Sequence, residues 1–274
     1  MRQEAYFCTV KELNELGKNN IPRQLISHTH LIYSSPATLA FNSPGAEGFG
    51  VKRAGLAVPD SVMLIVSPGC CGRNTSVLSS MRAYQDRFYY LLMDETDIVT
   101  GRHLKKIPKA VAEICEGLKK KPSVVMICIT CVDALLGTDM ERVCHKAEEY
   151  AGVPVRPCYM YALTREGRKP PMVHVRQSVY SLLEPKKKKG NVVNLLGYFS
   201  PLTDDCELYD LLHGAGVKTI HEISRCKDYA QYQTMSEANF NLVLHPEARF
   251  AAEDFHDRLK IPYIELRRLY QIDK

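Results

Sequence analysis

Short apolar runs alternate with longer amphipathic stretches along most of this chain. The two clearest runs cover residues 62–66 and 124–128, and a helical spacing of apolar residues fills 102–118 between them. A second helical pattern over 140–151 ends near a glycine, and a third apolar run follows at 153–155. This strand, helix, strand, helix, strand order predicts βα units built on a parallel sheet.

A solvated linker interrupts this pattern. Residues 186–189 are four consecutive lysines, preceded by Pro185 and followed by Gly190. We therefore predict a first domain at residues 1–185 and a second, smaller domain at residues 190–274. The alternation restarts in the second domain, with strands expected at 192–196, 217–221, 240–244 and 261–266 and helices at 203–213 and 249–259. The predicted fold class is α/β, with two Rossmann-like domains whose mostly parallel sheets are flanked by helices.

Composition narrows the function classes. The formal net charge is +5, and the basic residues are scattered apart from the lysine run, so no nucleic-acid footprint is expected. The first residues do not resemble a signal peptide, and no run of about 18 apolar residues occurs, so we expect a cytoplasmic protein without a membrane segment. Ten cysteines in a chain of 274 residues indicate metal or redox chemistry in such a reducing compartment.

Three of these cysteines follow predicted strands. Cys70 and Cys71 come after the first strand, and Cys131 comes after the second. Ligands of α/β sheets collect at the carboxyl ends of strands, and consecutive strands often lie side by side, so these thiolates are expected to converge on a metal. Gly69 and Gly72 would let the backbone approach an inorganic cluster and donate N–H groups to it.

The other cysteines carry less signal. Cys115 and Cys144 lie on apolar helix faces and are expected in the core. Cys128 is spaced as a CxxC pair with Cys131, but residues three apart in a strand face opposite sides, so we expect it to pack within the sheet. No partner spacing occurs at Cys8, Cys206, Cys226 or Cys158, the last of which follows a predicted strand.

Two longer segments resemble a known family. The sequence MDETDIVTG at 93–101, followed by LKK at 104–106, and the sequence ITCVDALLGTD at 129–139 are similar to two motifs of the nitrogenase component 1 family. That family includes the molybdenum–iron protein, its cofactor-assembly scaffold and related reductases. The resemblance extends from about residue 44 to the end of the chain.

The resemblance implies a set of cluster ligands. Cys131 matches a ligand of the cluster at the family's subunit interface. A second ligand matches Cys70 if the Gly-Cys pair is aligned, or Cys71 if Ser67 and Pro68 are aligned, and both could bind. A further family ligand falls near 42–46, where this chain has no cysteine. A [4Fe–4S] cluster takes about four protein ligands, so the expected cofactor is one cluster shared in a homodimer or with a homologous subunit.

The resemblance also implies a function. We expect the iron–sulfur, electron-accepting subunit of a nitrogenase-like reductase. No P-loop occurs, so we expect no ATP hydrolysis in this chain. The resemblance implies instead that electrons come from a separate ATP-dependent iron–sulfur reductase. Asp133 and His245 are the candidate catalytic residues, His245 standing where the family has a cofactor-binding cysteine. Asp139 is interpreted as a helix cap as readily as a proton donor.

Two alternatives remain open. The chain could be a scaffold for assembly of a metal cofactor, or a non-catalytic partner subunit. Family members usually have three domains and the resemblance covers two, so the third is expected to be lost or supplied by another polypeptide.

Overall fold

A computed structural model describes residues 9–20, 22, 50–69, 79–160 and 169–266. The chain divides into two compact units, residues 1–43 and 44–274, and each is described by itself. In the first unit, α1 (Val10–Leu16) begins with a capping box, in which Thr9 and Glu12 satisfy each other's backbone N–H groups. A short 3-10 turn, η1 (Lys18–Asn20), follows.

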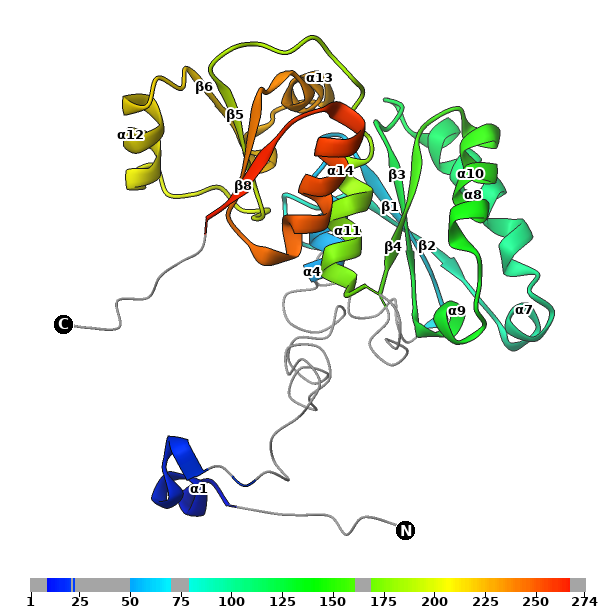
Figure 1. Cartoon of the computed structure of the whole chain (residues 1–274). Helices are drawn as coiled ribbons and strands as arrows, with labels where there is room; N and C mark the ends of the chain where they lie inside the picture. Colours follow the sequence, from blue (N-terminus) through cyan, green and yellow to red (C-terminus); the bar gives the residue numbers. More distant parts are fainter. Residues whose placement is uncertain (1–8, 21, 23–49, 70–78, 161–168, 267–274) are drawn as a thin grey trace. The chain divides into compact units, whose positions relative to one another are not determined.

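The second unit contains two four-stranded sheets, and every strand pairing among the described residues is parallel (Figure 1). The first sheet has the order β2-β1-β3-β4, with β1 (Val62–Ser67), β2 (Phe88–Leu92), β3 (Val125–Ile129) and β4 (Val155–Tyr159). The second has the order β6-β5-β7-β8, with β5 (Val192–Leu196), β6 (Thr219–His221), β7 (Phe240–Val243) and β8 (Tyr263–Glu265). The predicted α/β class with two parallel sheets is confirmed.

Helices connect and cover these strands. Those around the first sheet are α4 (Gly50–Gly55), α7 (Glu95–Thr100), α8 (His103–Gly117), α9 (Cys131–Leu135), α10 (Met140–Ala151) and α11 (Pro171–Tyr180). Those of the second are α12 (Glu207–Gly214), α13 (Tyr229–Gln233) and α14 (Arg249–Leu259), with short 3-10 turns η4 (Ile223–Arg225), η5 (Thr234–Glu237) and η6 (Pro246–Ala248).

The two central strands of the first sheet, β1 and β3, are buried on both faces, which explains their apolar runs. Along β1, Val62, Leu64 and Val66 belong to a core that includes the apolar faces of α8 and α10. Met63 and Ile65 point the other way and belong to a core with α4 and α11. Alternate residues of one strand therefore enter two different cores.

The core around α11 continues into the second sheet. It includes Leu196 of β5, Val243 of β7 and Phe255 of α14. Hydrogen bonds reinforce this packing: the Tyr232 hydroxyl donates to the carbonyl of Val179 at 2.5 Å. Both sheets thus share one hydrophobic core, while Val193, Leu195 and Leu242 on the far face of the second sheet form a smaller core beside α12.

Several element boundaries differ from the predictions. The third strand is β4 at Val155–Tyr159 rather than 153–155, so Cys158 lies inside a strand, fully buried opposite Cys128. Arg156 and Pro157 obscure this strand in the sequence. Proline is tolerated because β4 is the edge of its sheet.

The sequence patterns also missed one strand, β2, and several helices, namely α1, α4, α7, α9, α11 and α13. Strand β2 reads FYYLL and is buried on one face only, so it gives a weaker signal than β1 or β3. The helix expected at 203–213 begins later, at Glu207. The predictions for α8, α10 and α14 are confirmed to within a residue.

The lysine run has no regular structure and lies along the turn η5. The backbone N–H of Lys189 donates to the carbonyl of Glu237 at 2.8 Å, and the Lys188 ammonium donates to the carbonyl of Ser236 at 2.7 Å. The division into domains 1–185 and 190–274 stays a prediction. Within the described residues, no helix is both long and apolar enough to span a membrane.

Candidate functional site

The predicted cysteine loops leave neighbouring strands. β1 and β3 pair directly, with Val66 opposite Ile129. From β1 the chain passes to β2 on one side and later to β3 on the other, so a topological switch point lies between β1 and β3. Such points open a crevice at the carboxyl ends of the two strands. The prediction that the two loops share one edge is confirmed.

The cluster ligands themselves lie at the limit of what the structure describes. Cys131 is the first residue of α9, but its side chain is outside the described part, as are Cys70, Cys71 and Gly72. Gly69 is exposed, with open space where a side chain would stand. Among the described side chains, no group of three His, Cys, Asp or Glu residues gathers into a metal site. The predicted ligands therefore stay predictions.

Unpaired polar atoms do gather at this edge. Ser67 is the last residue of β1, Thr130 follows β3, and Asp133 lies in α9. Their atoms Ser67 Oγ, Thr130 Oγ1 and Asp133 Oδ2 are buried and lack a hydrogen-bond partner in the described part of the chain. Leaving such an atom unpaired costs about 1–3 kcal/mol. Hydroxyl groups in this position could donate to the sulfides of a cluster, so the edge fits an iron–sulfur group.

A buried hydrogen-bond network lies behind the Cys131 loop. His103 Nε2 is 2.8 Å from Asp133 Oδ1, and both side chains are almost completely buried. Thr138 donates from its hydroxyl to the same oxygen at 2.9 Å. His103 Nδ1 lies 3.0 Å from the carbonyl oxygen of Asp97, which can only accept. Nδ1 therefore carries a hydrogen, and a second hydrogen lies between Nε2 and Oδ1.

Asp97 extends this network to the surface. Its buried carboxylate accepts from Lys106 Nζ at 2.7 Å and Arg102 Nε at 2.8 Å. The hydrogen bond from Lys106, followed by that from Arg102, holds the pKa of Asp97 well below its ordinary value. Asp97 and Asp94 also form a capping box at the start of α7. The network therefore ties α7, α8 and α9 together.

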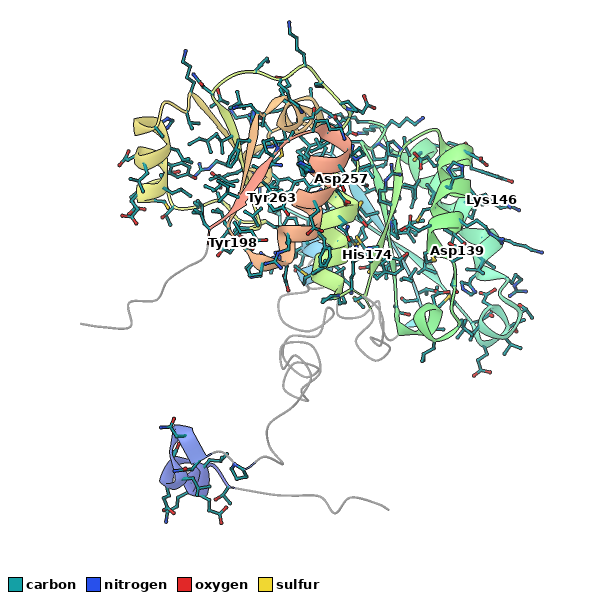
Figure 2. The ribbon with its side chains drawn as sticks, in the orientation of Figure 1. Asp139, Lys146, His174, Tyr198, Asp257 and Tyr263 are labelled. Atoms are coloured by element: carbon teal, nitrogen blue, oxygen red, sulfur yellow. The ribbon has the colours of Figure 1, made fainter. Side chains whose placement is uncertain are left out.

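Sequence reasoning missed His103 and Asp97. The available signal for His103 was its position on the inward face of α8, four residues before Ile107. Asp133, a candidate catalytic residue, is fully buried and paired with His103, and its catalytic role stays a prediction. Asp139 caps α10 by accepting from the backbone N–H of Arg142 at 3.1 Å, as one interpretation predicted (Figure 2).

The other candidate, His245, lies at the switch point of the second sheet, between the carboxyl ends of β5 and β7. Its ring packs edge-on against Tyr198, with centroids 5.8 Å apart, and its Nδ1 accepts from the backbone N–H of Glu247 at 3.3 Å. Burial, and next the charge of Arg176, lower the pKa of His245. The imidazole is thus favoured in its neutral form, and its catalytic role stays a prediction.

Gly197 makes this arrangement possible. Its φ is +136°, and an added Cβ would lie 2.7 Å from the backbone nitrogen of His245. We expect Gly197→Ala to lower the free energy of unfolding by about 2–3 kcal/mol, because backbone strain and overpacking add. Urea denaturation measures this. Gly214→Ala, at a helical glycine with open space around it, should be neutral or stabilising, and an equal loss in both variants would contradict the explanation.

The chain is similar to known proteins in sequence. The model of the family described as Nitrogenase component 1 type Oxidoreductase matches residues 47–274. The chain is 27% identical over 225 residues to the nitrogenase iron-molybdenum cofactor biosynthesis protein NifE of Nostoc sp., covering 79% of this chain and 46% of that protein. The NifE protein of Klebsiella pneumoniae is 26% identical over 244 residues, covering 81% and 53%.

Solved structures resemble the fold. A chain of nitrogenase Cp1 at pH 6.5 superimposes with a TM-score of 0.61 at 17% identity, covering 80% of this chain and 52% of that one. A chain of nitrogenase Cp1 at pH 5 gives 0.56 at 22% identity, covering 78% and 46%. This chain therefore spans about half the length of the proteins it matches.

Proposed function

Because this chain belongs to the nitrogenase component 1 type oxidoreductase family, we propose that it is a cluster-binding subunit of a scaffold on which a metal cofactor is assembled. The proposal makes the scaffold, first considered as an alternative, the leading function. Electron acceptance in a nitrogenase-like reductase becomes the second candidate.

One observation carries this choice. Curated relatives such as the NifE proteins of Nostoc sp., Rhizobium meliloti and Sinorhizobium fredii, which match 79–85% of this chain, are named for iron-molybdenum cofactor biosynthesis rather than for nitrogen reduction. Fold alone does not distinguish scaffold from reductase, because both would use the same sheets and the same cysteine loops. The names of the relatives therefore decide the order of the two candidates.

The proposed cofactor is a [4Fe–4S] cluster at the carboxyl edge of the first sheet. Cys131 and one or both of Cys70 and Cys71 would hold it. The adjacency of β1 and β3 supports this, because it brings the two loops to one crevice. The unpaired hydroxyls of Ser67 and Thr130 support it as possible donors to sulfide. When bound, such a cluster supplies one-electron transfer.

The proposed partners follow from the ligand count. Two or three cysteines per chain do not complete a set of about four, so a second copy or a homologous subunit would supply the rest. An ATP-dependent iron–sulfur reductase would deliver electrons. The buried pair of His103 and Asp133 would hold the start of α9, and with it Cys131, in a fixed position.

A transfer experiment distinguishes scaffold from reductase. The full chain, with any subunit that copurifies, is loaded anaerobically with radioactively labelled iron and mixed with a cofactor-free acceptor enzyme. We expect the label to pass to the acceptor and the acceptor to gain activity. In a parallel sample, an ATP-dependent reductase and reductant should give no sustained substrate turnover. Retention of the label together with sustained turnover would favour the reductase function.

A further inference from the structure

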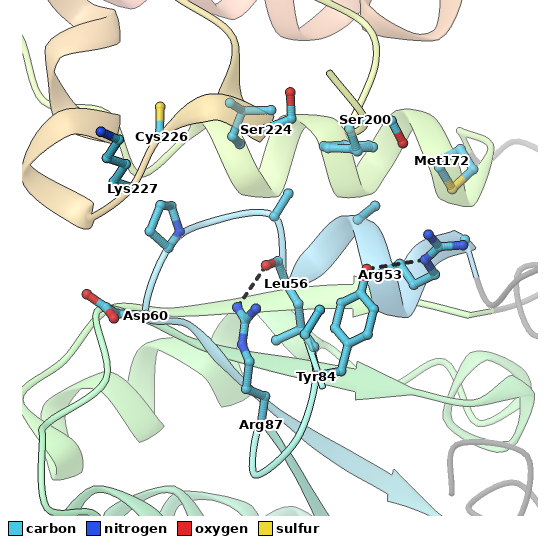
Figure 3. Close-up of a pocket in the computed structure, with 17 residues that line it drawn as sticks. Arg53, Leu56, Asp60, Tyr84, Arg87, Met172, Ser200, Ser224, Cys226 and Lys227 are labelled. Atoms are coloured by element: carbon cyan, nitrogen blue, oxygen red, sulfur yellow. Dashed lines mark hydrogen bonds between the residues drawn. The ribbon is translucent and has the colours of Figure 1, made fainter. Parts of the chain in front are cut away.

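A second site lies away from the cysteine loops. A cavity of about 510 Å³ separates the amino ends of β1 and β2 from the carboxyl ends of β5 and β6 (Figure 3). Its volume is in the range of small-molecule sites, about 300–1,000 Å³. Residues just before β1 and β2 form one wall, so the cavity is at the opposite edge of the first sheet from Gly69 and Cys131.

The charges lining this cavity are mostly positive. Arg53, Arg87 and Lys227 line it, and Asp60 is the one acidic residue among its described lining residues. Asp60 is already paired with Lys120 at 2.7 Å. Burial raises the pKa of the lining Cys226 thiol to about 11, so that thiol adds no negative charge near neutral pH.

These three cations lack the carboxylate partners that other basic residues have. In the described part of the chain, no carboxylate oxygen lies within ion-pair distance of Arg53, Arg87 or Lys227. Several arginines elsewhere are paired in this way, namely Arg102, Arg156, Arg176, Arg225 and Arg249. The cavity therefore concentrates positive charge that the protein itself does not neutralise.

The two arginines are also held in place. Arg87 donates from Nε to the carbonyl of Ser61 at 2.9 Å and from Nη2 to that of Leu56 at 2.8 Å, while Nη1 has no partner in the described residues. Arg53 donates from Nε to the Tyr84 hydroxyl at 3.2 Å, and neither of its Nη groups has a hydrogen-bond partner among the described residues (Figure 3). Fixed guanidinium groups lose little entropy when they bind an anion.

The remaining lining suits the body of an organic molecule. Ser224 also lines the cavity, and its Oγ is buried without a hydrogen-bond partner among the described residues. Leu56, Met172, Phe199 and Ile223 supply apolar surface. In Figure 3, Lys227 and Ser224 lie on one wall, and Arg53 and Arg87 lie on the other.

From this arrangement we propose that the cavity binds a small organic anion with carboxylate or phosphate groups. Opposed cationic walls would hold the charged groups, because guanidinium and ammonium groups recognise both kinds of oxygen. The apolar side chains would cover the carbon skeleton. This site is independent of the proposed cluster and does not require it.

Calorimetric titration of the full chain tests the proposal. Glutarate and glycerol 3-phosphate are the anionic probes, and neutral glutaramide is the uncharged control. We expect one saturable site for at least one anion, weakened by added salt. The anion that binds with the higher affinity shows whether the site prefers a carboxylate or a phosphate group. Glutaramide should not bind.

Two pairs of variants localise the site. Arg53→Gln with Lys227→Gln should weaken binding about tenfold or more, because each lost charged hydrogen bond contributes more than a neutral one. Arg142→Gln with Lys146→Gln removes two positive charges from exposed positions of α10 and should leave binding unchanged. Circular dichroism checks that the variants are folded. If the double variant unfolds, binding is measured with Lys227→Gln alone. Absence of saturable binding, equal binding by glutaramide, or equal affinity in both variants would overturn the proposal.

Discussion

Replacing Cys131, Cys70 and Cys71 together by alanine is expected to remove the iron from the anaerobically purified protein. Without these thiolates the chain would keep none of the cluster ligands assigned to it. We expect the iron content per chain to fall at least about tenfold, and the visible absorption and paramagnetic signals to disappear with it. Metal analysis and electron paramagnetic resonance measure the change. Of the three single variants, Cys131→Ala should show the largest loss.

Cys206→Ala is the matched control. Cys206 is partly exposed at the start of α12, and its side chain makes no capping hydrogen bond there, so its replacement should leave the iron content unchanged. The apoprotein of the triple variant should also keep its helical circular dichroism. Full iron content in a folded triple variant would rule out these cysteines as the ligands.

Replacing Asp133 by alanine is expected to destabilise the protein strongly. The substitution removes the partner of buried His103 and leaves its Nε2 without an acceptor. Breaking a buried pair in this way costs about 3–5 kcal/mol, and urea denaturation of the apoprotein at constant pH measures it. Asp133→Asn should cost less, because an amide oxygen can still accept from the ring.

Two further variants separate the pair from ordinary helix effects. Asp139→Ala removes only the cap of α10 and should cost about 1 kcal/mol. His103→Ala, combined with Asp133→Ala, completes a double-mutant cycle, and a large coupling energy is expected because the two side chains are in contact. A loss for Asp133→Ala no greater than that for Asp139→Ala would contradict the importance of the buried pair.

The amino-acid sequence by itself determined the fold class and most of the central strands. β1, β3 and β5 are buried on both faces, so nearly all of their positions are apolar and each run is visible without any knowledge of the fold. The exceptions are buried Ser67 at the end of β1 and buried Asn194 within β5. The helical spacing of apolar residues also predicted α14, with both of its ends at the residues where the structure has them. The sequence also indicated that the cysteine loops share an edge, because that follows from the order of strands in βα units.

Tertiary structure alone decided the features that depend on distant residues meeting. His103 and Asp133 are separated by thirty positions along the chain, and each by itself reads as an ordinary polar residue. Arg53, Arg87 and Lys227 line one cavity although Lys227 lies far from the two arginines in the sequence, and no local pattern records this. Periodicity reports which side of one element is buried, but contact between elements depends on how a shared core packs them together.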